Sequence, residues 1–288
     1  MTDFTETNLT EAVLARLDGA PNPRFKQIMS SLIRHMHDFV RDVEMTEEEW
    51  FEAIKFLTST GQKCDDKRQE FILLSDTLGV SMLVDAINHR KPGGATESTV
   101  FGPFYVNGSA SLPKWANVSE GVAGEPTFMS GHVKTVDGKP IAGAQLDLWQ
   151  TDGEGFYDVQ LPNLKSMQAR GKIIADAEGH YGFRTIKPVS YPIPTDGPVG
   201  KMLNGMGRHP YRPAHIHAIV SAPGFEPVTT HVFVKGDPYL QSDAVFGVKN
   251  SLITEFVKRE GTAPDGTKSN TPFWEVQYDF VLASAKWV

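Results

Sequence analysis

The sequence predicts an α+β fold, with a helical N-terminal domain over residues 1–95 and an antiparallel β-sandwich domain over residues 96–288. Three observations lead to this prediction. The chain has 288 residues, about twice a common domain length, which favours two domains. Apolar residues recur at helical spacing through the first ninety or so positions. After Gly94 the apolar runs become short, β-branched and aromatic, with a turn signal about every ten residues, as is typical of a sandwich.

The first two predicted helices lie in the first 43 residues. Asn8 and Glu11 are placed to cap a short helix that runs to Leu17, because side-chain oxygens at such positions accept hydrogen bonds from free backbone N–H groups. The second helix carries one continuous apolar face from Phe25 to Val43.

Two further helices are expected before the sandwich. Thr46–Glu49 fits the capping-box pattern, in which the first and fourth residues bond each other's backbone N–H, so a helix should begin there. Apolar residues at helical spacing then predict one helix from about Asp66 to Asn88. This helix should end before Lys91–Gly94, because the Lys-Pro-Gly-Gly sequence breaks helices.

The strand candidates follow in order along the second domain. Asp137-Gly138 stands between the apolar runs 131–136 and 144–150, and this arrangement predicts a hairpin. Two long connections, 154–172 and 187–212, exceed ordinary hairpin loops, and loops of this length usually carry function. Further strands are predicted at 181–186, 214–221 and 228–234.

Composition excludes several classes of function. The net charge of −7 lacks the basic excess typical of nucleic-acid-binding proteins, so no nucleic-acid partner is expected. The single Cys64 cannot form an intramolecular disulfide or a Cys-rich metal site. The acidic, polar residues 1–17 do not resemble a secretory signal, and no apolar run is long enough for a membrane span, so a cytoplasmic protein is expected. Any metal must therefore be held by His, Tyr or carboxylate side chains.

The clearest chemical motif is the His-Ile-His sequence at residues 215–217. Residues two apart on a strand point to the same face, so His215 and His217 suit two neighbouring ligands of one metal ion. The pair alone is equally compatible with two histidines on a polar strand face.

Each long connection also carries a tyrosine among Pro and Gly residues, Tyr157 in the first and Tyr191 in the second. Such a tyrosine is ordinarily a packing residue with its hydroxyl in water. Two phenols and two imidazoles together form a specific set of metal ligands. Because a phenol has a high pKa, a strongly Lewis-acidic trivalent ion is needed to keep it deprotonated, and Fe(III) meets this need better than Zn²⁺, Mg²⁺ or Ca²⁺.

These motifs resemble the intradiol ring-cleavage dioxygenases. The resemblance rests on Gly155–Asp158, Tyr191–Pro194, Arg212–His217 and Ser221–Phe225, and it spans nearly the whole chain. It implies a non-haem Fe(III) centre, one ion per subunit, with two axial and two equatorial protein ligands. The implied axial ligands are Tyr191 and His217, and the implied equatorial ligands are Tyr157 and His215.

Within this family the sequence is similar to members that act on hydroxyquinol, 1,2,4-trihydroxybenzene. Catechol-cleaving members usually carry Glu in the loop at 99–105 and Gln at the position of His231, where this chain has Thr-Val-Phe-Gly-Pro-Phe-Tyr and His. The helical stretch Leu73–Leu78 is similar as well. The resemblance implies cleavage of hydroxyquinol by O₂ to 3-hydroxy-cis,cis-muconate and maleylacetate. Two alternatives stay open, a catechol or substituted-catechol 1,2-dioxygenase and a non-enzymatic sandwich that binds a ligand.

The resemblance also implies roles for residues around the iron. Arg212 would stabilise negative charge that develops on the ring, Tyr191 would take up a proton, and His231 would orient substrate or be an ordinary sheet histidine. Asp76 is costly to bury among apolar neighbours unless a partner such as the third substrate hydroxyl bonds to it; a surface or interdomain contact is the alternative. The residues expected to contact substrate are Leu73, Asp76, Val100, Phe101, Gly102, Pro103, Phe104, Ile193, Pro194, Arg212 and Val245.

The N-terminal helices have apolar faces larger than one sandwich would cover, which favours association of two copies. The resemblance implies a homodimer through these helices. It also implies a phospholipid at the dimer interface, because known members of the family hold one there.

Overall fold

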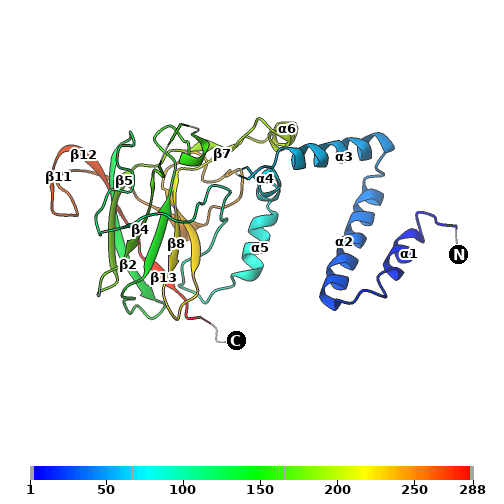
Figure 1. Ribbon diagram of the computed structural model, residues 1–288, viewed down its shortest axis with the longest axis horizontal. Helices are drawn as coiled ribbons and strands as arrows, with labels where there is room; N and C mark the ends of the chain where they lie inside the picture. Colours follow the sequence, from blue (N-terminus) through cyan, green and yellow to red (C-terminus); the bar gives the residue numbers. More distant parts are fainter. Residues whose placement is uncertain (1–2, 67, 162, 165, 286–288) are drawn as a thin grey trace. The chain divides into compact units, whose positions relative to one another are not determined.

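The computed structural model of the chain describes residues 3–66, 68–161, 163–164 and 166–285. The chain divides into two units, Met1–Ser59 and Thr60–Val288 (Figure 1). This division places α4 (Glu70–Thr77) and α5 (Val80–Asn88) in the unit that holds the sandwich. The domain boundary after residue 95 stays a prediction.

The first unit contains α1 (Leu9–Ala15), α2 (Pro23–Asp42) and most of α3 (Glu47–Gln62). The capping box at the start of α3 is confirmed, because Glu49 N donates to Thr46 Oγ1 at 3.2 Å and Thr46 N donates to Glu49 Oε2 at 3.0 Å. The predicted cap of α1 is wrong. Asn8 precedes α1, but its side chain accepts a hydrogen bond from Thr5 N at 2.8 Å and so serves the preceding turn instead.

The single helix predicted over 66–88 is two helices, α4 and α5. Gly79 separates them with φ of +75°, a left-handed conformation that side-chain-bearing residues adopt at a cost. α4 packs against α6 (Pro198–Gly205), which lies in the second long connection. Because the helix breaks at Gly79, α4 has a direction of its own and contacts α6 in that connection.

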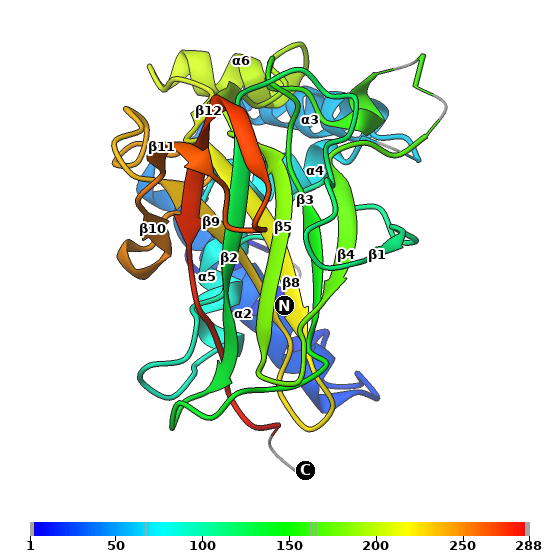
Figure 2. The ribbon, with the colours of Figure 1, turned by 90° about the vertical axis from the view of Figure 1, so that its left-hand side faces the viewer.

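The sandwich consists of two sheets. The first has the order β1-β4-β3-β8-β9-β10 and contains β1 (Ser111–Leu112), β3 (Gln145–Trp149), β4 (Arg170–Ile174), β8 (His215–Ser221), β9 (Val228–Val234) and β10 (Ile253–Thr254). The second has the order β11-β12-β2-β13 with β5 also paired to β2, and contains β2 (Pro126–Thr135), β5 (His180–Ile186), β11 (Val257–Thr262), β12 (Lys268–Gln277) and β13 (Phe280–Leu282). A separate ribbon pairs β6 (Tyr191–Pro192) with β7 (Tyr211–Arg212), and two short 3₁₀ helices, η1 (Asp158–Gln160) and η2 (Asn250–Leu252), lie in connections. Figure 2 shows β2, β5 and β8 running lengthwise with α6 at one end.

The strands of the first sheet that carry chemistry, β3, β4, β8 and β9, pair antiparallel as predicted. The second sheet is mixed, because β2 pairs antiparallel with β5 but parallel with both β12 and β13. The sandwich is therefore not antiparallel throughout. Its core joins both sheets and includes the fully buried side chains of Met129, Leu146, Phe183, Val232 and Phe280.

A short hairpin forms at Asp137-Gly138, where Lys134 and Pro140 make an antiparallel bridge, but the predicted pairing of the longer runs 131–136 and 144–150 is wrong. The turn itself forms, with Gly138 N donating to Thr135 O at 2.9 Å. The strands on either side of it, β2 and β3, belong to different sheets. After this short hairpin the chain passes from one sheet to the other, and the longer runs pair within their own sheets.

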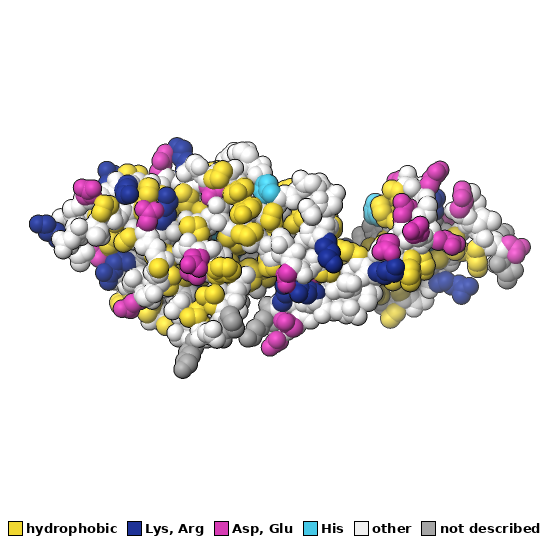
Figure 3. All heavy atoms as spheres, turned by 90° about the horizontal axis from the view of Figure 1, so that it is seen from above, with side chains coloured by type: hydrophobic (Ala, Val, Ile, Leu, Met, Phe, Trp, Pro, Cys, Tyr) yellow, Lys and Arg dark blue, Asp and Glu magenta, His cyan; other side chains and the backbone are white. Residues whose placement is uncertain are grey.

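The helices of the first unit expose much apolar surface, and Figure 3 shows apolar side chains among the charged ones on this surface. None of the residues of α2, all of which the structure describes, is buried. About half of the surface is exposed on each of its apolar side chains Phe25, Ile28, Leu32, Met36, Phe39 and Val40, and on Val43 directly after the helix. Among the described residues, no helix combines the length and hydropathy needed to cross a membrane.

Candidate active site

A row of buried rings crosses the first sheet at the start of β8. His215 and His217 lie two residues apart on β8, so both project from one face. Trp149 of β3 is the neighbour of His217 on one side and His231 of β9 is its neighbour on the other. Trp149 stacks on His217 at 4.5 Å between ring centres with 13° between planes. The stacked indole fixes the plane of this imidazole.

The two long connections bring two phenols to the same place. Tyr157 directly precedes η1, and its N–H donates to Gln160 Oε1 at 2.9 Å. Tyr191 begins β6 and pairs across the ribbon with Arg212 of β7. Tyr157 Oη lies 3.0 Å from Tyr191 Oη and 2.9 Å from His217 Nε2. Both tyrosine side chains are buried, so their hydroxyls face each other and the histidines, not water.

A glycine permits this approach. Gly155 has φ of +91°, and a Cβ atom placed on it would lie 2.9 Å from Tyr191 Cβ. Tyr157 and Tyr191 can therefore share one site only if position 155 has no side chain.

The donor atoms converge in the way that a metal ion requires. His215 Nε2 lies 3.1 Å from His217 Nε2, which continues the series of contacts from Tyr191 through Tyr157 and His217. His215 Nδ1 lies 2.6 Å from Pro213 O and must donate to it, so Nε2 of this ring carries a lone pair. Two donors bound to one ion at about 2.1 Å and at right angles lie about 3.0 Å apart. The spacing of these phenol and imidazole atoms fits a single bound cation.

A third histidine borders the same site. His215, His217 and His231 are buried, their ligand atoms lie within 4.8 Å of one another, and the group can bind a metal ion. Arg212 Nη2 lies 3.4 Å from His231 Nδ1. Because a guanidinium only donates, Nδ1 of His231 accepts and its proton lies on Nε2, which leaves this ring less suited to bind metal than the other two.

Burial of the site favours the neutral forms of its imidazoles and phenols. Burial lowers the pKa of His215, His217 and His231 well below the ordinary value, so all three imidazoles are uncharged. Burial also raises the pKa of Tyr157 well above the ordinary value, and Tyr191 raises it further. Burial raises the pKa of Tyr191 as well, although the Arg212 guanidinium opposes this effect. A strong Lewis acid is therefore needed to deprotonate these phenols.

Arg212 supplies a buried positive charge beside the donors. Its Nη1 lies 3.3 Å from His215 Nε2, and its Nε lies 3.1 Å from Asp243 Oδ1. Burial alone would lower the pKa of Arg212, but the Asp243 carboxylate and the two phenols raise it above its usual value. The guanidinium therefore stays charged within the site.

Most of the residues predicted to contact substrate gather on one side of this centre. Leu73, Val100, Ile193 and Val245 belong to one buried apolar cluster. A cavity of about 470 Å³ opens beside it, and its lining includes the predicted residues Leu73, Pro103, Phe104, Ile193 and Pro194. Phe104 stacks on Tyr157 at 4.6 Å, which joins the cavity wall to the donor cluster.

The remaining predicted residues differ in exposure. Asp76 is buried on the same helix as Leu73, and burial raises the pKa of its carboxyl, whereas Ser81 and Arg212 lower it in part. A Cβ atom on Gly102 would lie 3.5 Å from His217 Cε1, so its backbone passes close to the site. Phe101 is 46% exposed and packs edge-on against Tyr105 at 4.9 Å. Of these residues Phe101 is the one open to solvent.

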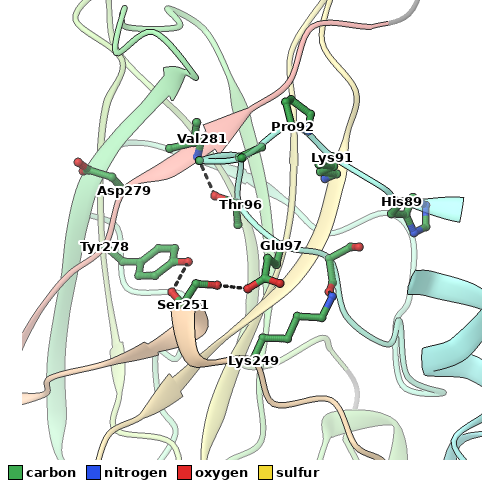
Figure 4. Close-up of a pocket in the computed structure, with 14 residues that line it drawn as sticks. His89, Lys91, Pro92, Thr96, Glu97, Lys249, Ser251, Tyr278, Asp279 and Val281 are labelled. Atoms are coloured by element: carbon green, nitrogen blue, oxygen red, sulfur yellow. Dashed lines mark hydrogen bonds between the residues drawn. The ribbon is translucent and has the colours of Figure 1, made fainter. Parts of the chain in front are cut away.

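A second cavity, of about 510 Å³, lies away from the rings, between the 89–98 segment and the strands around Tyr278 (Figure 4). Several of its charged groups bond to neighbouring side chains. Lys249 Nζ lies 3.5 Å from Asp85 Oδ2, Asp279 pairs with Lys134 at 2.7 Å, and Glu97 accepts from the Ser251 hydroxyl. The clustered histidine and tyrosine donors lie in the ring-lined site instead, so that site is the better candidate.

Comparison with known proteins identifies the class. A profile described as "Dioxygenase" matches residues 100–284, and one described as "Catechol dioxygenase N terminus" matches residues 22–96. The chain belongs to the intradiol ring-cleavage dioxygenase family, and it is an enzyme of that family. Within the family it is 53% identical to a 6-chlorohydroxyquinol 1,2-dioxygenase of Cupriavidus pinatubonensis, with 98% of this chain and 99% of the relative covered. It is 51% identical to a hydroxyquinol 1,2-dioxygenase of a Rhizobium species, with 97% and 96% covered.

A solved structure gives the same picture of the fold. The crystal structure of hydroxyquinol 1,2-dioxygenase from Pseudomonas putida DLL-E4 matches with a TM-score of 0.92 and 49% identity, over 97% of this chain and 99% of that chain. The predicted α+β architecture of helices followed by a sandwich is thus confirmed.

Sequence reasoning missed three residues of the site. Asp243 binds Arg212, Trp149 stacks on His217, and Gln160 holds the backbone of Tyr157. Gln160 follows Tyr157 by three residues, the spacing of a capping interaction, so the sequence did contain a signal for it. Asp243 is 31 residues from Arg212 and belongs to no motif, so only the fold reveals that contact.

Proposed function

We propose that the protein is an Fe(III)-dependent hydroxyquinol 1,2-dioxygenase. It would cleave hydroxyquinol between its two adjacent hydroxylated carbons with O₂ and give 3-hydroxy-cis,cis-muconate, which tautomerises to maleylacetate. Both oxygen atoms of O₂ enter the product. The observation that carries the proposal is the buried set of two phenol and two imidazole donors with neighbouring atoms 2.9–3.1 Å apart. The names of the relatives described above support the choice of substrate.

One iron per subunit would be held by Tyr157, Tyr191, His215 and His217. When bound, Fe(III) supplies Lewis acidity, which keeps the phenols and the substrate diol deprotonated and draws electron density from the ring. Two phenolates are hard anionic ligands that favour the ferric state over the ferrous state. The absence of thiol ligands agrees with this preference, because the single Cys64 lies outside the site.

The chain's own groups would handle the proton and the charge of the reaction. Tyr191 Oη would accept a proton from a substrate hydroxyl. Its neighbour Arg212 stabilises the phenolate before this transfer, and would stabilise the substrate anion after it. Arg212 would stabilise negative charge on the substrate ring, because a buried guanidinium acts there with little screening by water. His231, which carries its proton on Nε2, would orient substrate by donating a hydrogen bond from this N–H group.

The apolar walls and Asp76 would select the ring. Leu73, Val100, Phe104, Ile193 and Val245 give a flat aromatic ring apolar contacts on several sides. The Asp76 carboxyl would accept a hydrogen bond from the third hydroxyl of hydroxyquinol, which relieves the cost of burying this group. The remaining predicted contacts are Phe101, Gly102, Pro103 and Pro194.

The alternative substrate is catechol or a substituted catechol, which would undergo the same reaction without the contact to Asp76. Oxygen uptake by the iron-loaded protein with each diol separates the two. A kcat/KM at least tenfold higher for hydroxyquinol than for catechol is expected. Equal values, or a preference for catechol, would reject hydroxyquinol as the specific substrate.

We also propose that two copies associate through the helices of the first unit, since α2 leaves a continuous apolar stripe uncovered. A phospholipid acyl chain at that interface would cover further apolar surface. A cytoplasmic location agrees with a chain whose single Cys64 cannot form the intramolecular disulfides common in oxidising compartments.

A further inference from the structure

Arg212 and Asp243 form a buried ion pair at the edge of the active site. Their side chains are 4% and 2% exposed. Arg212 Nε lies 3.1 Å from Asp243 Oδ1, and Arg212 Nη2 lies 3.3 Å from Asp243 Oδ2. This two-point contact fixes both the position and the plane of the guanidinium, since a single contact would leave it free to turn.

The same carboxylate holds the loop that carries it. Asp243 Oδ2 accepts from Gly247 N at 2.9 Å, and Asp243 Oδ1 accepts from Val245 N at 3.3 Å. The Thr99 hydroxyl donates to Gly247 O at 2.7 Å and ties this loop to the segment before Val100. Asp243 is therefore fixed from several sides and can act as a rigid support for Arg212.

The contact also decides which part of Arg212 faces the reaction. A guanidinium has five N–H donors in a fixed plane. Asp243 occupies the Nε and Nη2 edge, and Nη1 remains beside His215 Nε2 at 3.3 Å. The pairing turns the donors of Nη1 toward the donor cluster, where the substrate diol would lie.

Space around the pair is closed. A Cβ atom on Gly247 would lie 2.9 Å from Arg212 Nη2 and 3.2 Å from Asp243 Oδ2. Gly247 does not have a positive φ, so an alanine there would disturb the ion pair by contact and not by backbone strain.

We propose that Asp243 is a positioning residue for ring cleavage, which holds the Arg212 guanidinium in the plane that stabilises the anionic substrate. Asp243 acts through Arg212 and does not itself bind substrate. This inference rests on the proposed function and adds to it a residue on which the rate depends. A role limited to capping the 243–247 loop is the competing explanation.

Asp176 offers a matched control for that explanation. It too accepts two backbone N–H groups, from His180 at 2.8 Å and Glu178 at 3.1 Å, and it pairs with a cation, Lys114, at 2.7 Å. It follows Ile174, which ends β4 at the opposite end from Arg170, the partner of Trp149. Asp176→Asn thus removes a loop support with the same bonding pattern, although in a pair about one third exposed, at a distance from the site.

The experiment compares Asp243→Asn, Gly247→Ala and Asp176→Asn in the iron-loaded enzyme. Each variant is measured for kcat and KM with hydroxyquinol, for hydroxyquinol affinity without O₂, for iron content and for Tm. We expect Asp243→Asn and Gly247→Ala to lower kcat about tenfold to a hundredfold, because small displacements of a catalytic group cost rates of this order. Iron content should stay at the wild-type level, and Asp176→Asn should leave kcat within about twofold.

A double-variant cycle separates positioning from support of the loop. In an Arg212→Gln background, adding Asp243→Asn should lower kcat by less than about twofold, because the group that Asp243 positions is gone. An equal fall in both backgrounds would overturn the proposal, as would an unchanged kcat in a folded Asp243→Asn or Gly247→Ala variant. Unfolding of both single variants would assign Asp243 to stability and would overturn it too.

The wild-type measurement distinguishes the two levels of inference. If the wild type cleaves hydroxyquinol and the variants match it, the role of Asp243 fails and the proposed function stands. If the iron-loaded wild type cleaves neither hydroxyquinol nor catechol, the proposed function fails and the role of Asp243 fails with it.

Discussion

Tyr157 Oη lies 2.9 Å from His217 Nε2, although the two residues are 60 positions apart in the chain. The contact joins a loop after β3 to β8, an interior strand of the first sheet, and both groups are buried. A phenol that meets a neutral imidazole in a buried site, beside a second phenol and a second imidazole, places four lone-pair donors around one point. This relationship is the basis of the metal site proposed above.

Replacing Tyr157 by Phe should weaken iron binding. The change removes one hard oxygen donor and leaves the packing of the ring on Phe104 intact. We expect iron affinity to fall at least about tenfold, and the visible absorption of the iron-loaded protein to fall with it. Metal analysis and a visible spectrum at equal added iron provide the measurement.

Tyr239→Phe is the control for this change, because Tyr239 stacks on Tyr211 at 4.6 Å away from the donor cluster. Its colour and iron content should match the wild type. Full colour in Tyr157→Phe would remove this tyrosine from the ligand set.

Gly155→Ala should displace Tyr191. Position 155 has φ of +91°, and the added Cβ would lie 2.9 Å from Tyr191 Cβ. Gly138 also has a positive φ, +83°, but a Cβ there would meet no atom within 4 Å. Both alanine variants should lose about 1–2 kcal/mol of stability from backbone strain. Only Gly155→Ala should lose iron and activity, and equal iron content in the two variants would contradict the role assigned to Tyr191.

Asp76→Asn should lower the preference for hydroxyquinol. A hydrogen bond to a charged carboxylate is about 1 kcal/mol stronger than one to a neutral amide, so kcat/KM for hydroxyquinol should fall roughly fivefold to tenfold. The value for catechol, which lacks the third hydroxyl, should change by less than about twofold. An equal fall of kcat/KM for both substrates would show that Asp76 does not bind that hydroxyl.

The same variant should gain stability relative to the wild type as the pH rises. Burial raises the pKa of Asp76 above its usual 3.8, so the folded state resists ionisation of this carboxyl more than the unfolded state does. The cost of the ionised group is absent below pH 3.8, grows as the pH rises and is complete above the raised pKa. Tm values of the two proteins across this pH range check the sign. The Tm of the variant minus the Tm of the wild type should increase with rising pH, and a decrease would contradict the prediction.

Leu32→Glu on the apolar stripe of α2 should dissociate the proposed dimer, because two carboxylates would be buried at the contact. Gln27→Glu on a different face of α2, where Gln27 accepts from Arg24 at 2.7 Å, adds the same charge as a control. Light scattering should give the mass of one chain for Leu32→Glu and of two chains for Gln27→Glu. A monomeric wild type would reject the dimer.

Local chemistry made some of the fold predictable. The capping box at Thr46 and Glu49 acts within four residues, so its sequence pattern is sufficient to place a helix start. Gly79 shows the limit of periodicity, because apolar spacing continues across it and a single glycine is tolerated in many helices. The break there follows from φ of +75°, a left-handed conformation that glycine adopts without the cost that other residues incur.

Tertiary pairing explains the other differences. Asp137-Gly138 forms the turn that its sequence favours, but β2 finds three partners in its own sheet and β3 finds two in the other. The His pair and the two Tyr motifs could be singled out because each motif is local and chemically distinctive. Asp243 could not, since its importance arises only from the position of Arg212 in the folded chain.

The visible absorption spectrum of the iron-loaded protein tests the central claim most directly. Phenolate ligands on Fe(III) should give a red-brown protein through charge transfer from Tyr157 and Tyr191, with one iron per chain by metal analysis. Addition of hydroxyquinol without O₂ should shift this band, because the diol would replace Tyr191. A protein that contains one iron per chain and is colourless, with no change on addition of hydroxyquinol, would contradict the account.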